Sequence, residues 1–143
     1  MLPIRPYHSA DSTTVLNIWL AASREGHPFF NEEELSRQRE LVQNHYLPVA
    51  EMWVYDHNGI LGFIGMLQTT IGGLFVAPQH FRKGVGSALI RHVAALKGSL
   101  SVEVFSANPQ AVAFYHRCGF REHQRAVNTD VLPHQELIIM RQS

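Results

Sequence analysis

The chain has little of what several common classes of protein require. Cys118 is its only cysteine, so no disulfide can form within it, and this favours a reducing compartment. There is no run of about 18 apolar residues, which a membrane-spanning helix would need. The N-terminus lacks the apolar stretch of a signal peptide. We therefore expect a cytoplasmic protein with no membrane partner.

The charged residues favour neither a nucleic-acid partner nor a metal. Twelve Lys and Arg residues balance twelve Asp and Glu residues, whereas proteins that cover a nucleic-acid backbone usually carry a basic excess. The nine histidines are scattered, and no two have the His-x3-His spacing of a helical zinc site. We expect no nucleic-acid partner and no bound metal.

Length and periodicity predict one α/β domain over residues 1–143. The pattern indicates a mixed sheet of six or seven strands with about four helices. Strands are expected at 2–6, 52–55, 60–67, 70–76, 100–105, 120–127 and 135–141. Helices are expected from 9 or 11 to 26, over 31–46 and 84–97, and from Asn108-Pro109 to Gly119.

The turn between a strand and an amphipathic helix carries the strongest chemical pattern. Residues 82–87 read Arg-Lys-Gly-Val-Gly-Ser and open the helix after the strand that ends at 76. Free N–H groups and the dipole at a helix N-terminus bind anions, and Gly84 and Gly86 carry no Cβ to hold a phosphate away. The pattern is not a P-loop, and Leu89 stands where a dinucleotide fingerprint needs glycine.

Two motifs stand in order along the chain. The first is Leu74-Phe75-Val76-Ala77-Pro78 followed by Arg82-Lys83-Gly84-Val85-Gly86, and the second is Asn108-Pro109-x-Ala111-x-x-Phe114-Tyr115-x-x-x-Gly119-Phe120. Together they resemble the motifs of the GCN5-related N-acetyltransferase (GNAT) superfamily, in which the first is the acetyl-CoA pyrophosphate motif. The resemblance extends from Ile4 to the last strand. One departure is Phe81, where the family often has Gln or Arg.

The resemblance implies the GNAT fold, a mixed and mostly antiparallel sheet in which two central parallel strands splay apart. Acetyl-CoA would lie in that opening as co-substrate, between strands 70–76 and 100–105. The implied cofactor-binding residues are Leu74, Phe75, Val76, Arg82, Lys83, Gly84, Val85, Gly86, Ser87 and Asn108.

Acetyl transfer to an amine needs a base for the amine and an acid for the departing thiolate. Tyr115 occupies the family's usual general-acid position, although it could also be a core tyrosine on an amphipathic helix. Glu103 interrupts an apolar strand and is the candidate general base, directly or through a water; the alternative is a solvated carboxylate. Cys118 has no convincing partner in the sequence, so direct transfer in a ternary complex is preferred to an acetyl-enzyme.

The acceptor is expected to bind near the turn between the first two helices, which in this family forms part of the acceptor wall. His27 could orient an amine or relay a proton, and a plain turn histidine is the alternative. Phe29 lies in the same turn. Thr70 and Gly72 are small residues expected near the reacting carbon.

Three functions stay open. The leading one is acetylation of a primary amine on a protein, at a lysine or the N-terminus. The second is acetylation of a small amine, such as an aminoglycoside, a polyamine or an amino-acid derivative, which a strongly acidic pocket would favour. The third is a non-catalytic acetyl-CoA sensor, against which Tyr115 and Glu103 argue. Both monomer and homodimer are compatible with the sequence. The carboxylates available for an acidic pocket are Glu25, Glu32, Glu33 and Glu34.

Overall fold

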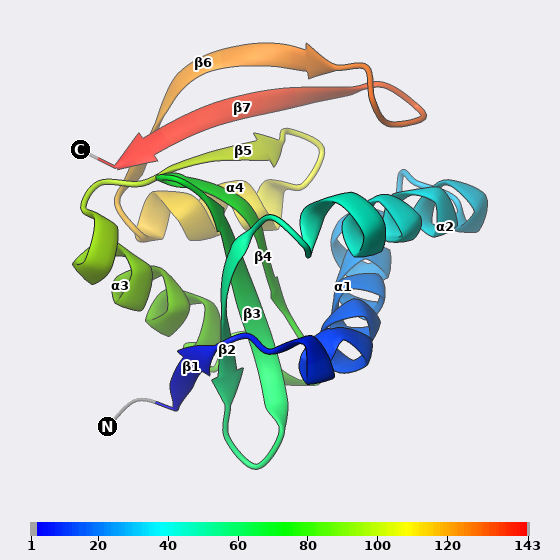
Figure 1. Cartoon of the computed structure of the whole chain (residues 1–143). Coiled ribbons are helices and arrows are strands. Elements are labelled where there is room, and N and C mark those ends of the chain that lie inside the picture. Colours follow the sequence, from blue (N-terminus) through cyan, green and yellow to red (C-terminus); the bar gives the residue numbers. More distant parts are fainter. Residues whose placement is uncertain (1–2, 143) are drawn as a thin grey trace.

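The computed structural model describes residues 3–142, so Leu2 of the first predicted strand lies outside the described residues (Figure 1). The strands are β1 (Ile4–Pro6), β2 (Glu51–Asp56), β3 (Ile60–Leu67), β4 (Thr70–Val76), β5 (Ser101–Phe105), β6 (Phe120–Asn128) and β7 (Gln135–Gln142). The helices are α1 (Ser12–Gly26), α2 (Glu32–Leu41), α3 (Val85–Lys97) and α4 (Pro109–Arg117), with single turns η1 (Ser9–Asp11), η2 (Val42–Tyr46) and η3 (Pro78–His80).

The strands form one seven-stranded sheet in the order β1-β2-β3-β4-β5-β7-β6. Every neighbouring pair is antiparallel except β4 and β5, which run parallel. Their pairing is limited to Thr70 opposite Ser101 and Ile71 opposite Val102. Beyond this point the strands diverge, and β5 runs across the top of Figure 1 whereas β4 runs down through its middle. The predicted mixed sheet with a splayed parallel pair is confirmed.

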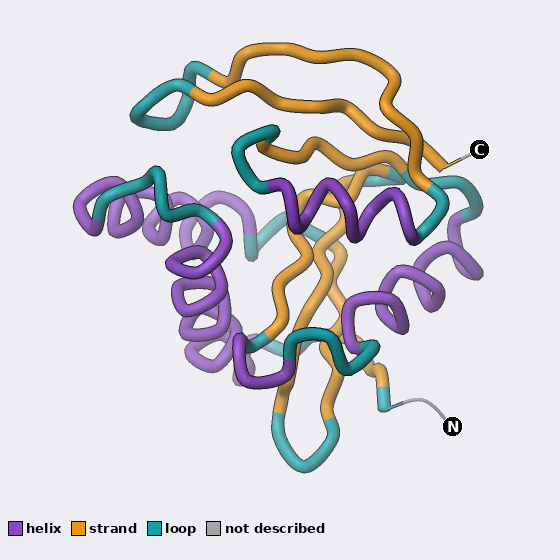
Figure 2. Tube along the Cα trace, turned by 180° about the vertical axis from the view of Figure 1, so that it is seen from behind, coloured by secondary structure: helices purple, strands orange, loops and turns teal. Residues whose placement is uncertain are grey.

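Helices cover both faces of the sheet because each face carries its own apolar core. On one side α3 and α4 pack against residues such as Ile64, Met66 and Val102. On the other side α1 and α2 pack against Val54 and Phe63, among others. Figure 2 shows helices on either side of the strands. None of the helices within residues 3–142 is long and apolar enough to cross a membrane.

The predicted ends of two helices are confirmed by their hydrogen bonds. Asn31 Oδ1 accepts from the amide of Glu34 at 2.8 Å, and Asn108 Oδ1 accepts from that of Ala111 at 3.2 Å, so both cap a helix N-terminus. Gly119 follows α4 with φ of 90°, the left-handed backbone that favours glycine after a helix.

The predicted helix over 31–46 is interrupted. The α-helix ends at Leu41 and the chain continues as a π-helical turn to Tyr46. The Tyr46 side chain occupies a slot in which a methyl group at either Gly65 or Gly72 would overlap its hydroxyl. This contact joins residues far apart in the sequence, so helical periodicity alone cannot reveal it.

Candidate active site

A cleft of about 1780 Å³ opens where β4 and β5 diverge, and it reaches α1, the start of α3 and α4. It brings together all but two of the predicted site residues. Lys83 and Phe29 are not among its lining residues. The predicted residues that do line it are His27, Thr70, Gly72, Leu74, Phe75, Val76, Arg82, Gly84, Val85, Gly86, Ser87, Glu103, Asn108 and Tyr115.

The start of α3 has the geometry of an anion site. Gly84 has φ of 84°, which favours glycine, and nothing lies within 4 Å of where its Cβ would be. The first intrahelical bond runs from the Ala88 amide to the Gly84 carbonyl at 3.0 Å. The amides of Val85, Gly86 and Ser87 precede that bond, so the helix itself leaves them free to hold a phosphate.

Gly86 serves packing as well as the expected approach of a phosphate. A Cβ on this residue would lie 3.0 Å from Cζ of Phe114. Its missing side chain therefore lets α3 pack closely against α4. At Gly84, by contrast, an added Cβ would point into open space.

The edge of β4 that faces the opening offers free main-chain groups. The amide of Ala77 donates to the Leu61 carbonyl of β3 at 2.8 Å. Because the direction of these groups alternates along a strand, those of Leu74 and Val76 point away from β3, towards β5. The ladder with β5 ends at Ile71, so these groups are available to an extended ligand.

Asn108 stands between α4 and the end of α1. Its Oδ1 caps α4 through Ala111, and its Nδ2 would lie 3.1 Å from a Cβ on Gly26. The oxygen is thus engaged, while the amide nitrogen remains as a hydrogen-bond donor at the cleft.

Tyr115 is both a core residue and a lining residue of the cleft. It is 7% exposed, and its ring packs edge-on against Phe114 and Phe120, with centroids 5.2 and 5.3 Å away. Burial, with smaller contributions from Cys118 and Tyr46, raises the pKa of its phenol above the ordinary value. The phenol therefore stays protonated near neutral pH and can donate a proton.

Glu103 lies on β5 with an exposed side chain, between the buried Val102 and Val104. It is opposite Ile139 of β7 and lines the cleft. No salt bridge to it is found in the part of the chain that the structure describes. Its carboxylate is therefore open to an incoming amine or water.

His27 lies in an aromatic setting, with the rings of Phe29, Phe30 and Phe105 at 5.5, 5.9 and 5.0 Å. Burial lowers the pKa of its imidazole to about 4. The ring is neutral near pH 7 and can accept a hydrogen bond from an amine, but it is a weak base. Phe29 supports this ring.

Thr70 lines the cleft at the point where β4 and β5 still pair. Its hydroxyl shares a hydrogen bond of 2.9 Å with the Ser101 hydroxyl, which ties β4 to β5 at the point where they still pair. The Thr70 side chain therefore joins the two strands just before they diverge.

Sequence reasoning missed Tyr46, which also lines the cleft. Its hydroxyl is buried and finds no hydrogen-bond partner among the described residues, and burial raises the pKa of the phenol. The available signal was the Gly72-Gly73 pair, which predicts a bulge or the close approach of a ligand. The strand register does shift there, and the group that approaches Gly72 is Tyr46.

The carboxylates near the first turn do not form a joint acidic pocket. Of the four that the sequence offered, only Glu25 lines the cleft. Glu32 pairs with Arg24, and Glu34 pairs with Arg37. Within residues 3–142 no group of three or more side chains of the metal-ligating kinds comes together.

Comparisons with known proteins agree with this geometry. Residues 48–122 match the family model described as acetyltransferase (GNAT) domain. The chain is 33% identical over 119 residues to the peptidyl-lysine N-acetyltransferase YiaC of Escherichia coli (strain K12), and the aligned region covers 82% of each chain. The solution structure of apo-form YjaB from Escherichia coli superposes with a TM-score of 0.88 at 25% identity, over 99% of this chain and 97% of YjaB.

A third match shares the fold. The crystal structure of PaiA N-acetyltransferase from Thermoplasma acidophilum in complex with coenzyme A has a TM-score of 0.78 at 15% identity, over 100% of this chain and 99% of the other. The family model, the relative at 33% identity and the splayed sheet lead to one conclusion. The chain belongs to the GNAT family and is an N-acetyltransferase.

Proposed function

We propose that this enzyme transfers the acetyl group of acetyl-CoA to the side-chain amine of a protein lysine, by direct attack in a ternary complex, and that residues 1–143 act as one domain. The observation that carries the proposal is the cleft between β4 and β5, which has a protonated phenol, Tyr115, and an exposed carboxylate, Glu103, in its lining. The peptidyl-lysine activity in the name of the YiaC relative supports lysine as the acceptor.

The cleft has the features that acetyl-CoA binding requires. The amides at the start of α3, beside Arg82, would hold the pyrophosphate. The main chain of Leu74 and Val76 would bond the pantetheine arm, with the Asn108 amide as a further donor. PaiA N-acetyltransferase, which has the same fold, binds coenzyme A, and this supports acetyl-CoA as the co-substrate.

Acetyl-CoA supplies an activated thioester, and the chain's own groups handle the protons. Glu103 would take a proton from the acceptor ammonium, directly or through a water, so that the neutral amine can attack. The Tyr115 phenol would donate its proton to the departing thiolate. Neutral His27 would accept a hydrogen bond from the amine and so orient it.

Direct attack is favoured over a covalent acetyl-enzyme by the state of Cys118. Burial raises the pKa of this thiol, and a thiol is a nucleophile only as the thiolate. Cys118 is also absent from the residues that line the cleft.

The two alternatives have less support. A polyamine or aminoglycoside carries several positive charges, and Glu32, Glu33 and Glu34 do not line the cleft. The carboxylates that do line it, Glu25, Glu103 and Asp130, come from three separate segments of the chain. A sensor without catalysis has no use for an open carboxylate at Glu103 and a protonated phenol at Tyr115.

The test is the release of free CoA thiol from acetyl-CoA in the presence of lysine peptides, N-terminal peptides, spermidine and an aminoglycoside. We expect release with lysine peptides and little with the others. Release only with a small amine would overturn the choice of acceptor. Stabilisation by acetyl-CoA without release for any acceptor would favour the sensor.

A further inference from the structure

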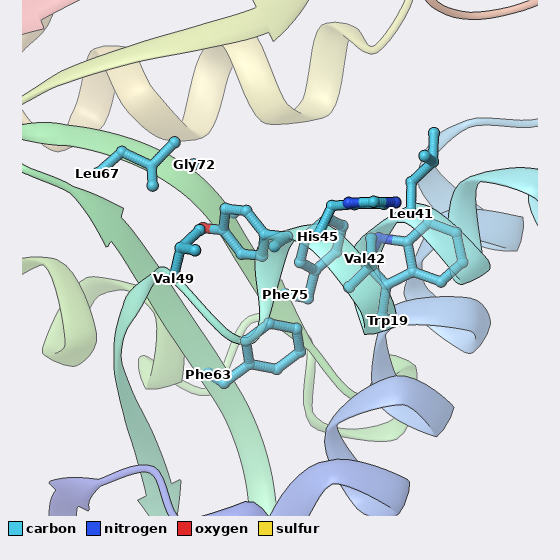
Figure 3. A pocket seen from close by; sticks show the side chains of 11 residues that line it. Trp19, Leu41, Val42, His45, Val49, Phe63, Leu67, Gly72 and Phe75 are labelled. Carbon is cyan, nitrogen blue, oxygen red and sulfur yellow. The ribbon is translucent and has the colours of Figure 1, made fainter.

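A second, smaller pocket lies on the α1/α2 face of the sheet and is almost entirely apolar (Figure 3). Its volume is about 360 Å³, within the range of small-molecule subsites. Its lining comes from α1, from the end of α2 and the turn after it, and from β3 and β4. The residues are Trp19, Leu41, Val42, His45, Tyr46, Val49, Phe63, Leu67, Gly72, Gly73 and Phe75. No carboxylate or lysine is among its lining residues.

The small pocket adjoins the catalytic cleft and shares part of its wall. Tyr46, Leu67, Phe75 and the glycines at 72 and 73 line both. The shared wall includes the β4 bulge next to the point where β4 and β5 separate. The pyrophosphate site at the start of α3 belongs to the cleft and not to this pocket. A group in the small pocket would therefore lie beside the cleft, away from the pyrophosphate end.

The rim of the pocket exposes large apolar side chains to solvent. Leu41 is 42% exposed, Leu67 is 46% exposed and Val49 is 70% exposed. Exposed apolar side chains that gather around one hollow mark a binding surface, whereas single ones scattered over a protein need no explanation. Here they surround a hollow that shares a wall with the cleft.

We propose that this pocket binds a large apolar side chain close to the acceptor lysine, so that the enzyme selects peptide segments in which such a residue neighbours the lysine. The inference rests on the proposed function. A lysine that reaches into the cleft brings the adjoining peptide across the rim. Burial of an apolar side chain there is favourable. A polycationic amine would instead have to shed water against an apolar wall without a charged partner.

The experiment uses the whole chain and peptides of glycine and serine that contain one lysine. In each peptide a phenylalanine is placed at one of the three positions on either side of the lysine, and the peptide without phenylalanine is the reference. We expect kcat/KM to rise about tenfold to hundredfold at one or two of these positions, mainly through a lower KM.

Matched variants test the place where the phenylalanine binds. Val49→Asp puts a charge on the exposed rim and should reduce the ratio of kcat/KM between the preferred peptide and the reference to near one. Leu96→Asp is the control, because Leu96 is 61% exposed on α3 and lines neither cavity. It should keep the wild-type ratio, and the ratio cancels any general loss of activity.

The outcomes separate this inference from the function on which it rests. Equal acetylation of all peptides by the wild type would overturn the apolar subsite and leave lysine acetylation intact. A preference that Val49→Asp and Leu96→Asp change equally would also overturn it. Acetylation of spermidine but of no peptide would contradict the proposed function and this inference together.

Discussion

Tyr115 and Tyr46 both line the cleft, but only the Tyr115 phenol has a proposed role in catalysis. Burial raises the pKa of both phenols, and Tyr46 adds a smaller contribution to the raised pKa of Tyr115. The Tyr46 hydroxyl is buried without a partner among the described residues. Tyr115, by contrast, is the proposed general acid.

Replacement of Tyr115 by phenylalanine removes the proposed proton donor and little else. We expect kcat for lysine-peptide acetylation to fall by about a hundredfold or more, the usual scale for a lost general acid, with unchanged affinity for acetyl-CoA. Steady-state kinetics and calorimetry measure the two quantities. Tyr55→Phe is the control, since Tyr55 lies on β2 outside the cleft. Equal rates for both variants would remove Tyr115 from the mechanism.

Tyr46→Phe should leave the free energy of unfolding unchanged or raise it by up to about 1 kcal/mol, because it removes an unsatisfied buried hydroxyl. Gly65→Ala should lower that free energy by about 1–3 kcal/mol, because the new methyl overlaps the Tyr46 hydroxyl. Urea denaturation measures both. A loss of stability in Tyr46→Phe would mean that the hydroxyl has a partner after all.

For single residues, the sequence predicted which side chains share a cleft but not the partners of those side chains. Tyr115, Glu103 and His27 all line one cleft, as predicted. The low pKa of His27 depends on three phenylalanine rings, of which Phe105 is remote in the sequence. The hydrogen bond of the Thr70 hydroxyl likewise depends on Ser101, a residue of another strand. Such partners are set by strand register and helix packing, which local patterns do not contain.

Among the elements, α2 is joined to the loop between β6 and β7 by a charged cluster. Glu34 is buried, and its carboxylate accepts hydrogen bonds from the side chains of Arg37 and Gln38. Arg37 also donates to the backbone carbonyl of Asp130. The hydrogen bond from Arg37, opposed by burial and assisted by Gln38, lowers the pKa of Glu34 to about 2. The cluster therefore stabilises the fold only while Glu34 is ionised.

This cluster predicts a specific loss of stability in acid. Since the pKa of Glu34 is lower in the folded chain than the ordinary 4.5, its contribution is complete above about pH 4.5 and is lost as the pH falls towards 2. Glu34→Gln should remove about 1–2 kcal/mol near pH 7, a figure kept low because Arg37 is 43% exposed. The variant and wild type should converge in acid. Denaturation at several pH values tests this, and a constant difference would contradict it.

The elements themselves were largely readable from local chemistry. The caps at Asn31 and Asn108 and the glycine after α4 appear in the sequence as short-range patterns. As predicted, each asparagine begins a helix and Gly119 follows the end of one. The sequence did not predict the π-helical turn after α2, because the slot that Tyr46 fills is built by β3 and β4, further along the chain. That turn places Tyr46 in the lining of the cleft.

For the molecule as a whole, the splayed sheet and the start of α3 must act together on one ligand. CoA at a hundredfold excess over its Kd should add about 2.7 kcal/mol to the free energy of unfolding. Pantetheine lacks the pyrophosphate, so at the same concentration it should raise Tm less. Thermal denaturation measures both shifts. Equal shifts would mean that α3 does not bind the pyrophosphate.

Periodicity along the sequence does not give the order of the strands in the sheet. Two motifs identified the family, and the fold of that family has this strand order. The pattern predicted strand–helix alternation after residue 76, and the structure has it. The apolar pocket was invisible, because it is assembled from α1, η2, β3 and β4. Surfaces that several elements share require the tertiary structure.

The most direct measurement of the central claim is the fate of a radiolabelled acetyl group in a single turnover. The enzyme is mixed with labelled acetyl-CoA and a lysine peptide, quenched at short times and separated. The account predicts that label moves to the lysine side chain of the peptide and that none remains on the protein at any time. Label held covalently on the enzyme, at Cys118 or elsewhere, before it reaches the peptide would contradict direct attack. Label that never reaches the peptide would contradict lysine as the acceptor.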